Sequence, residues 1–113
     1  MNKIVLLILL LQVKHFIFDI LIPSKYHWRK YIDVAGMVHS LLNGVFTALV
    51  FYLILPIPTL WVLSIFIADS FIHYHIDFVK DYYSTYTTNQ ELISGIDQLL
   101  HQITYLLLIL LVL

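Results

Sequence analysis

The stretch TLWVLSIFIADSFIHYHIDFV, residues 59–79, is long and apolar enough for a membrane helix, yet it carries Asp69, His73 and Asp77 at intervals of four residues. Four residues is slightly more than one helical turn, so these side chains rise along one face in steps of ~6 Å. Ionisable side chains are costly inside a bilayer and normally persist there only where they pair, bind something or act. The segment therefore predicts a membrane helix with a functional polar face.

Three further apolar segments repeat this pattern. Together with residues 59–79, they predict membrane spans over residues 4–22, 34–55, 59–79 and 92–113. Each span is near the ~20 residues that a bilayer requires. His15 and Asp19 lie four residues apart, as do Asp97 and His101, and His39 precedes Asn43 by the same interval. The pattern predicts one polar site with eight members: His15, Asp19, His39, Asp69, His73, Asp77, Asp97 and His101.

The composition sets the class of protein. Of the 113 residues, 61% are hydrophobic and 12% are charged, and the mean hydropathy is +0.91. A soluble domain of this length could not bury so much apolar surface, so we expect one integral membrane domain over residues 1–113. The net charge of -1 gives no reason to expect a nucleic-acid partner. Cysteine is absent, so any metal ligands must be nitrogen or oxygen atoms.

The connections between the spans predict how they are arranged. Pro23 closes the first span, and Pro56 and Pro58 bracket a turn so short that the second and third spans should form an antiparallel hairpin. Residues 4–13, 45–55, 57–68 and 103–113 contain no charged residue and no histidine. In an up-down-up-down four-helix bundle these halves lie at one end, and the eight polar candidates lie at the other. The sequence thus predicts an all-α bundle with a polar site near one membrane interface.

Basic residues predict the orientation. The first polar loop holds Lys25, Arg29 and Lys30, and the last begins with Lys80. The positive-inside rule places these loops in the cytoplasm, with both termini outside and the site facing the cytoplasm. The N-terminus resembles a signal peptide, but it has no small-residue cleavage site and runs directly into Lys14, so we expect a retained helix.

The ligand types indicate the metal and its chemistry. Imidazole and carboxylate groups suit divalent zinc, manganese, iron or nickel rather than copper(I). Eight candidates suggest two or three ions, and the Asp69–His73–Asp77 ladder could serve two of them with the middle residue near both. Paired ions can activate water and clamp the oxygens of a phosphoester. Asp77 and Asp97 lie closest to the loops and are candidate catalytic general bases.

Two other functions remain open. The same ligands could serve a divalent-metal transporter or sensor, although a transporter should have polar residues across the whole membrane. Alternatively, the chain could be a small membrane effector whose His and Asp side chains only hold its helices together. Homo-oligomerisation is possible, but no small-xxx-small face is clear enough to predict its geometry.

Several other polar residues have a less definite prediction. Asn43 is either a ligand or a support for one, and Gln102 and Tyr105 could support the site. Lys14 and Lys80 could neutralise an anionic head group or simply extend to the interface. The remaining two histidines are not expected to be ligands, because His75 turns to another face and His27 falls in a loop.

The order and spacing of these motifs resemble a known family. Lys14-His15 with Asp19, His39-Ser-Leu-Leu-Asn43-Gly44, Asp69-Ser-Phe-Ile-His73 with Asp77-Phe-Val-Lys80, and Asp97-Gln-Leu-Leu-His101 resemble the small bacterial and phage membrane proteins catalogued as domain of unknown function 3307. The resemblance covers almost the whole chain. That group is similar to membrane-bound metal-dependent hydrolases and, more distantly, to zinc phospholipase C and P1 nuclease.

The resemblance implies a helical bundle with a multinuclear site, usually of zinc, that acts on a phosphoester such as a lipid head group. It also implies that the eight His and Asp candidates are the ligands. The chain departs from soluble phospholipase C enzymes because it is far shorter and has no evident N-terminal ligand.

Overall fold

The computed structural model describes residues 2–21, 34–84 and 88–113, and every regular element in these ranges is a helix. The elements are α1 (Lys3–His15), a π-helical continuation η1 (Phe16–Leu21), α2 (Val34–Ile54), α3 (Thr59–Ser84) and α4 (Gln90–Val112). The all-α prediction is confirmed, and each expected segment is helical. The predicted end of the third helix is too early, because residues 80–83 contain no proline or glycine to stop it.

Three of these helices are long and apolar enough to cross a membrane: Gly36–Ile54, Thr59–Tyr83 and Gln90–Val112. α1 is shorter, with 13 residues, before the π-helical segment begins. Large apolar side chains face outward along the spanning helices, and Leu53, Leu60 and Leu110 are 67%, 74% and 68% exposed. An apolar exterior of this extent favours contact with lipid rather than water.

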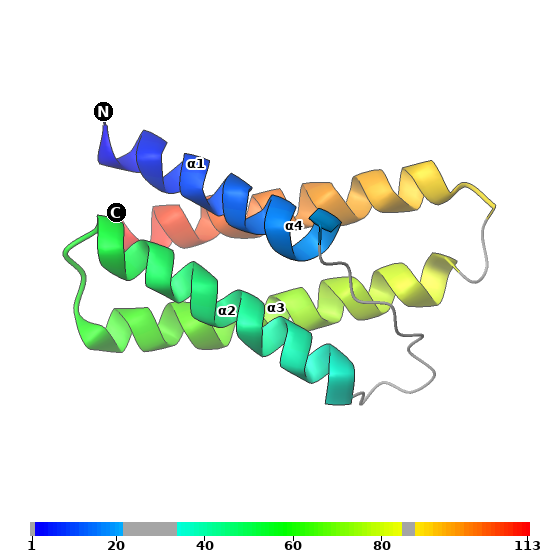
Figure 1. Cartoon of the computed structure of the whole chain (residues 1–113), viewed down its shortest axis with the longest axis horizontal. Helices are drawn as coiled ribbons and strands as arrows, with labels where there is room; N and C mark the ends of the chain where they lie inside the picture. The colour runs from blue at the N-terminus through cyan, green and yellow to red at the C-terminus, as the bar shows by residue number, and fades with distance from the viewer. Residues whose placement is uncertain (1, 22–33, 85–87) are drawn as a thin grey trace.

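Figure 1 shows how the helices are arranged. α2 and α3 lie side by side and form the most extensive helix pair, and α3 also packs against α4 and α1 against α2. The start of α1, the end of α4 and the α2–α3 connection lie at one end of the molecule. In that connection the carbonyl of Pro58 accepts the backbone N–H groups of Trp61 and Val62 at 3.0 and 3.2 Å and so begins α3. The prolines therefore set the short turn that the sequence predicts.

Small residues allow α2 and α3 to approach closely. Ser40, Gly44 and Ala48 recur every four residues on α2, and all three are buried. A Cβ atom added at Gly44 would lie 2.8 Å from the carbonyl oxygen of Phe66 and would collide with the side chain of Ser70. This is a small-xxx-small stripe within one chain. This stripe was not predicted from the sequence, because a small-xxx-small face was considered there only as a contact between chains.

The buried interior divides into an apolar and a polar set. The apolar set comprises Leu7, Leu11, Ala48, Phe51, Ile65, Tyr105, Leu108 and Ile109. The polar set comprises Lys14, His15, Ser40, Asn43, Thr47, Asp69, Ser70, His73, Asp97, His101 and Thr104. Burying so many polar groups is unfavourable unless they have partners, so the polar set contains the candidates for a functional site.

Candidate metal centre

Three helices bring five of the eight sequence-predicted residues together. In the part of the chain that the structure describes, two groups of His and Asp side chains could hold a metal ion: His39, His73 and Asp77, and Asp77, Asp97 and His101. Within each group the candidate ligand atoms all lie within 4.8 Å of one another. Asp77 is common to both groups, whereas the sequence led us to expect the middle residue of the ladder, His73, in that position.

The Asp77 carboxylate uses a different oxygen toward each group. Its Oδ2 atom lies 2.9 Å from Nε2 of His73 and 3.7 Å from Nε2 of His39. Its Oδ1 atom lies 3.3 Å from Nε2 of His101. One carboxylate therefore faces two sets of donors, which is the arrangement required of a bridging ligand.

His101 lies within ion-pair distance of two carboxylates. Its Nε2 atom is 3.3 Å from Asp77 Oδ1 and 3.4 Å from Asp97 Oδ1, yet it makes no hydrogen bond in the described structure. Tetrahedral zinc, with bonds of roughly 2.0–2.1 Å, holds neighbouring ligand atoms ~3.3 Å apart. The spacing and the missing hydrogen bonds both fit ligands that point at a common centre.

The site is buried, more deeply at its centre than at its edge. The side chains of His73 and His101 are 1% and 2% exposed, while His39 and Asp77 are 14% and 16% exposed. The rings of His73 and His101 lie against each other with their centroids 4.3 Å apart. These two histidines are therefore the most buried members of the two groups.

α1 adds a polar cluster next to the second group. The ring centroid of His15 lies 5.2 Å from that of His101, and His15 bonds to the side chains of Gln98 and Tyr105. Lys14 is 5% exposed and donates to the Tyr105 hydroxyl at 2.8 Å. Lys14 thus points into the bundle rather than to the interface. Tyr105 links α1 to α4 and so has the supporting position expected from the sequence.

The other candidates fall outside the two metal groups. Asp69 is 1% exposed, its Oδ2 atom has no hydrogen-bond partner in the described structure, and its role as a ligand stays a prediction. Asp19 belongs to η1, but its side chain lies outside the described residues, as does all of His27. Asn43 Nδ2 donates to the His39 carbonyl at 3.0 Å and lies 3.3 Å from His39 Nε2, so it supports that histidine.

His75 and Gln102 face elsewhere. His75 Nδ1 lies 2.8 Å from the Phe71 carbonyl one turn earlier, in keeping with the expectation that His75 is not a ligand. Gln102 bonds to Gln12 of α1. Neither residue is a member of the two metal groups.

Two contacts of Asp97 were missed from the sequence. Its Oδ2 atom accepts a hydrogen bond from Gln98 Nε2 at 3.3 Å and lies 3.5 Å from the ammonium of Lys80. Gln98 also bonds to His15. The signal in the sequence was that Gln98 is next to Asp97, a candidate ligand. Adjacent residues of a helix usually face different ways, however, so the contact depends on tertiary packing.

The Tyr105 hydroxyl is expected to stabilise the fold. Tyr105→Phe removes the hydroxyl that receives the Lys14 ammonium and leaves the ring in place. We expect a loss of about 1–3 kcal/mol in the free energy of unfolding, because the hydroxyl bonds to a charged donor in a buried place. Denaturant titration in detergent micelles measures this value. Tyr52→Phe, at a 58% exposed position, is the control, and equal stability of the two variants would contradict the assignment.

Comparison of the chain with protein families, curated proteins and solved structures found no match. Its class is therefore defined by its own fold and site. Over residues 2–21, 34–84 and 88–113 the chain is a helical protein with three helices that could span a membrane and with His and Asp groups that could hold metal ions.

Proposed function

We propose that this chain is an integral membrane hydrolase with two divalent metal ions that share the carboxylate of Asp77. The observation that carries the proposal is the position of Asp77, with one oxygen toward His39 and His73 and the other toward His101. If these side chains served only to hydrogen-bond to one another, one imidazole would be enough for each carboxylate. The contact of three imidazoles with a single carboxylate favours a bridged pair of ions.

The number of ligands favours catalysis over a structural metal. Structural zinc sites are closed by four protein ligands, whereas catalytic sites have three and leave a position open for water. Each group has three members among the residues that the structure describes. Two adjacent ions supply activated water and charge neutralisation for displacement at a phosphorus centre. The reaction class that suits this arrangement is hydrolysis of a phosphoester.

Asp97 is the better candidate for the general base. Asp77 faces three imidazoles, so both of its oxygens are engaged in holding the centre. Asp97 would hold the second ion through Oδ1, which lies next to His101, and its Oδ2 atom lies near Lys80 and Gln98. Oδ2 would therefore be the oxygen that accepts a proton from water.

The membrane setting completes the proposal. We infer an up-down-up-down bundle, with α1 and η1 as a fourth span, and a site near the interface that the loops face. The positive-inside rule assigns that interface to the cytoplasm, with both termini outside. The resemblance to domain of unknown function 3307 implies the helical bundle and a multinuclear site, with zinc as the expected metal.

Metal removal and hydrolysis of a p-nitrophenyl phosphodiester test the proposal. The purified protein should contain about two ions per chain by elemental analysis. It should hydrolyse the phosphodiester, lose this activity after chelation and regain it with added zinc. Asp97→Ala should lower kcat by about 10²–10⁴-fold, the usual contribution of a general base.

Glu91→Gln is the matched control, because Glu91 is an exposed acid on the same helix. Its activity should equal that of the unaltered protein. Bound metal without hydrolysis would leave a transporter or sensor. Fewer than one ion per chain would reject the metal centre and leave the His and Asp cluster as a structural one.

A further inference from the structure

We propose that the substrate is an anionic lipid, bound in a pocket between α3 and α4 with its phosphate at Lys80 and an acyl chain along the apolar wall. This inference rests on the proposed function, because it names the substrate of the same centre. It rests on a second observation, which is a pocket lined both by Asp97, a candidate metal ligand, and by apolar side chains.

The pocket is lined mostly by apolar side chains, with the charged pair Lys80 and Asp97 between them. It has a volume of about 320 Å³ and is lined by Lys80 and Asp97 together with Ile76, Ile93, Ile96 and Leu100. That volume is within the ~300–1,000 Å³ range of ligand sites. Asp97 belongs to the second metal group, so a molecule in this pocket has its polar end beside the centre.

The depth of the pocket matches a lipid phosphate. Lys80 is three residues before the end of the span Thr59–Tyr83, which is ~4.5 Å along a helix. On the loop side of Lys80 and Asp97 the pocket is lined by Tyr83 and Ile93, and one turn deeper it is lined by Ile76 and Leu100. Lys80 can therefore reach the level where a bilayer changes from head groups to hydrocarbon, and Ile76 and Leu100 continue the apolar wall toward the interior. A water-soluble phosphoester has no acyl chain to contact these apolar side chains.

Lys80 is able to exchange its partner. Its side chain is 42% exposed, while that of Asp97 is 3% exposed, and 3.5 Å separates the ammonium from the carboxylate. An ion held by Asp97 would reduce the negative charge that Lys80 faces. The flexible ammonium could then contact the phosphate of an incoming lipid. The protein has few other positively charged side chains.

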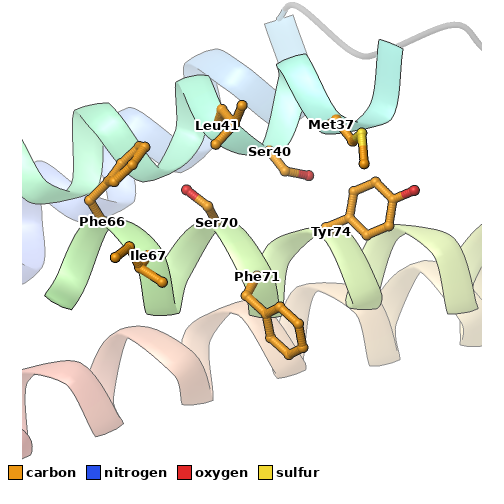
Figure 2. Close-up of a pocket in the computed structure, with 8 residues that line it drawn as sticks. All are labelled: Met37, Ser40, Leu41, Phe66, Ile67, Ser70, Phe71 and Tyr74. Carbon is orange, nitrogen blue, oxygen red and sulfur yellow. The ribbon is translucent and has the colours of Figure 1, made fainter. Parts of the chain in front are cut away.

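A groove on the neighbouring side of α3 provides an internal comparison. Figure 2 shows it between α2 and α3, with Met37, Leu41 and Phe71 at its sides and the hydroxyls of Ser40 and Ser70 within it. Its volume is about 410 Å³, so it is at least as large as the α3–α4 pocket. No charged side chain lines it. Size and hydrophobicity alone would favour this groove, whereas recognition of a phosphate favours the other.

Photocrosslinking in nanodiscs tests the proposal. The probes are phosphatidylglycerol and phosphatidylcholine with the same diazirine-labelled acyl chain. We expect phosphatidylglycerol to label residues 93–100 of α4 in preference to the α2–α3 groove, and to do so more than phosphatidylcholine. Lys80→Gln should lower this labelling about fivefold, the effect of one basic residue near an anionic lipid surface. Lys80→Arg should retain it, and Lys3→Gln, at an exposed lysine of α1, is the control.

Equal labelling by the two lipids, labelling centred on Met37 and Phe71, or labelling insensitive to Lys80→Gln would each overturn the proposal. The same experiment on Asp77→Asn separates it from the metal centre. Labelling that persists in this variant, together with a protein that never binds metal, would retain the lipid pocket and reject the hydrolase. Bound metal without selective labelling would reject the lipid pocket alone.

Discussion

Asp77→Asn is expected to abolish binding of both metal ions, not one. The substitution keeps the shape of the side chain but replaces one carboxylate oxygen by an amide nitrogen, which cannot serve as a ligand. The carboxylate faces His39 and His73 through one oxygen and His101 through the other, so each group loses a negatively charged ligand. Elemental analysis should show a fall from about two ions per chain to nearly none. Circular dichroism should show that the helices remain.

The geometry of the centre also predicts the pattern in the other variants. His73→Ala should remove the first ion and His101→Ala the second, so each variant retains about one ion per chain. Glu91→Gln is the matched control, since it makes the same carboxylate-to-amide change at an exposed position of α4 outside both groups. Its metal content should not change. Retention of one ion in Asp77→Asn would contradict a shared carboxylate at Asp77.

Gly44→Leu is expected to disrupt the pairing of α2 and α3. Even a Cβ atom at this position would lie 2.8 Å from the Phe66 carbonyl oxygen and would collide with Ser70. Backbone cannot move aside as a flexible side chain can, so the two helices must separate. Overpacking of a close contact costs typically about 1–3 kcal/mol, and we expect the upper end of this range because the obstacle is a main-chain atom. Denaturant titration in micelles measures the loss.

The matched control is Gly95→Leu. A Cβ atom at Gly95 meets no atom within 4 Å, so a leucine there extends into open space. Leucine also favours a helix over glycine by up to ~1 kcal/mol, so this variant should be equal to or more stable than the parent. Metal binding should fall in Gly44→Leu, since His39 on α2 and His73 on α3 would separate. Similar stabilities for the two variants would mean that the close approach is not needed.

The four-residue spacing predicted the five members of the two candidate metal groups, but it also predicted His15 and Asp69, which belong to neither, and Asp19, whose side chain lies outside the described residues. His39, His73, Asp77, Asp97 and His101 were predictable because spacing along a helix and the order of the connections depend on local chain geometry. The shared role of Asp77 was not predicted, because it depends on how far α2 and α4 slide along α3. The ion pair between Lys80 and Asp97 has the same origin, since it joins two helices across a pocket.

The sequence by itself determined an all-helical chain, the apolar character of its spans and the residue types available to bind a metal. These properties follow from composition and from periods of a few residues. Only the tertiary structure decided which candidates meet: Asp77 between two groups, Gly44 against the backbone of Phe66, and Asp69 apart from the rest. The physical reason is that the relative shift and rotation of packed helices depend on side-chain shape over the whole interface, which no local pattern encodes.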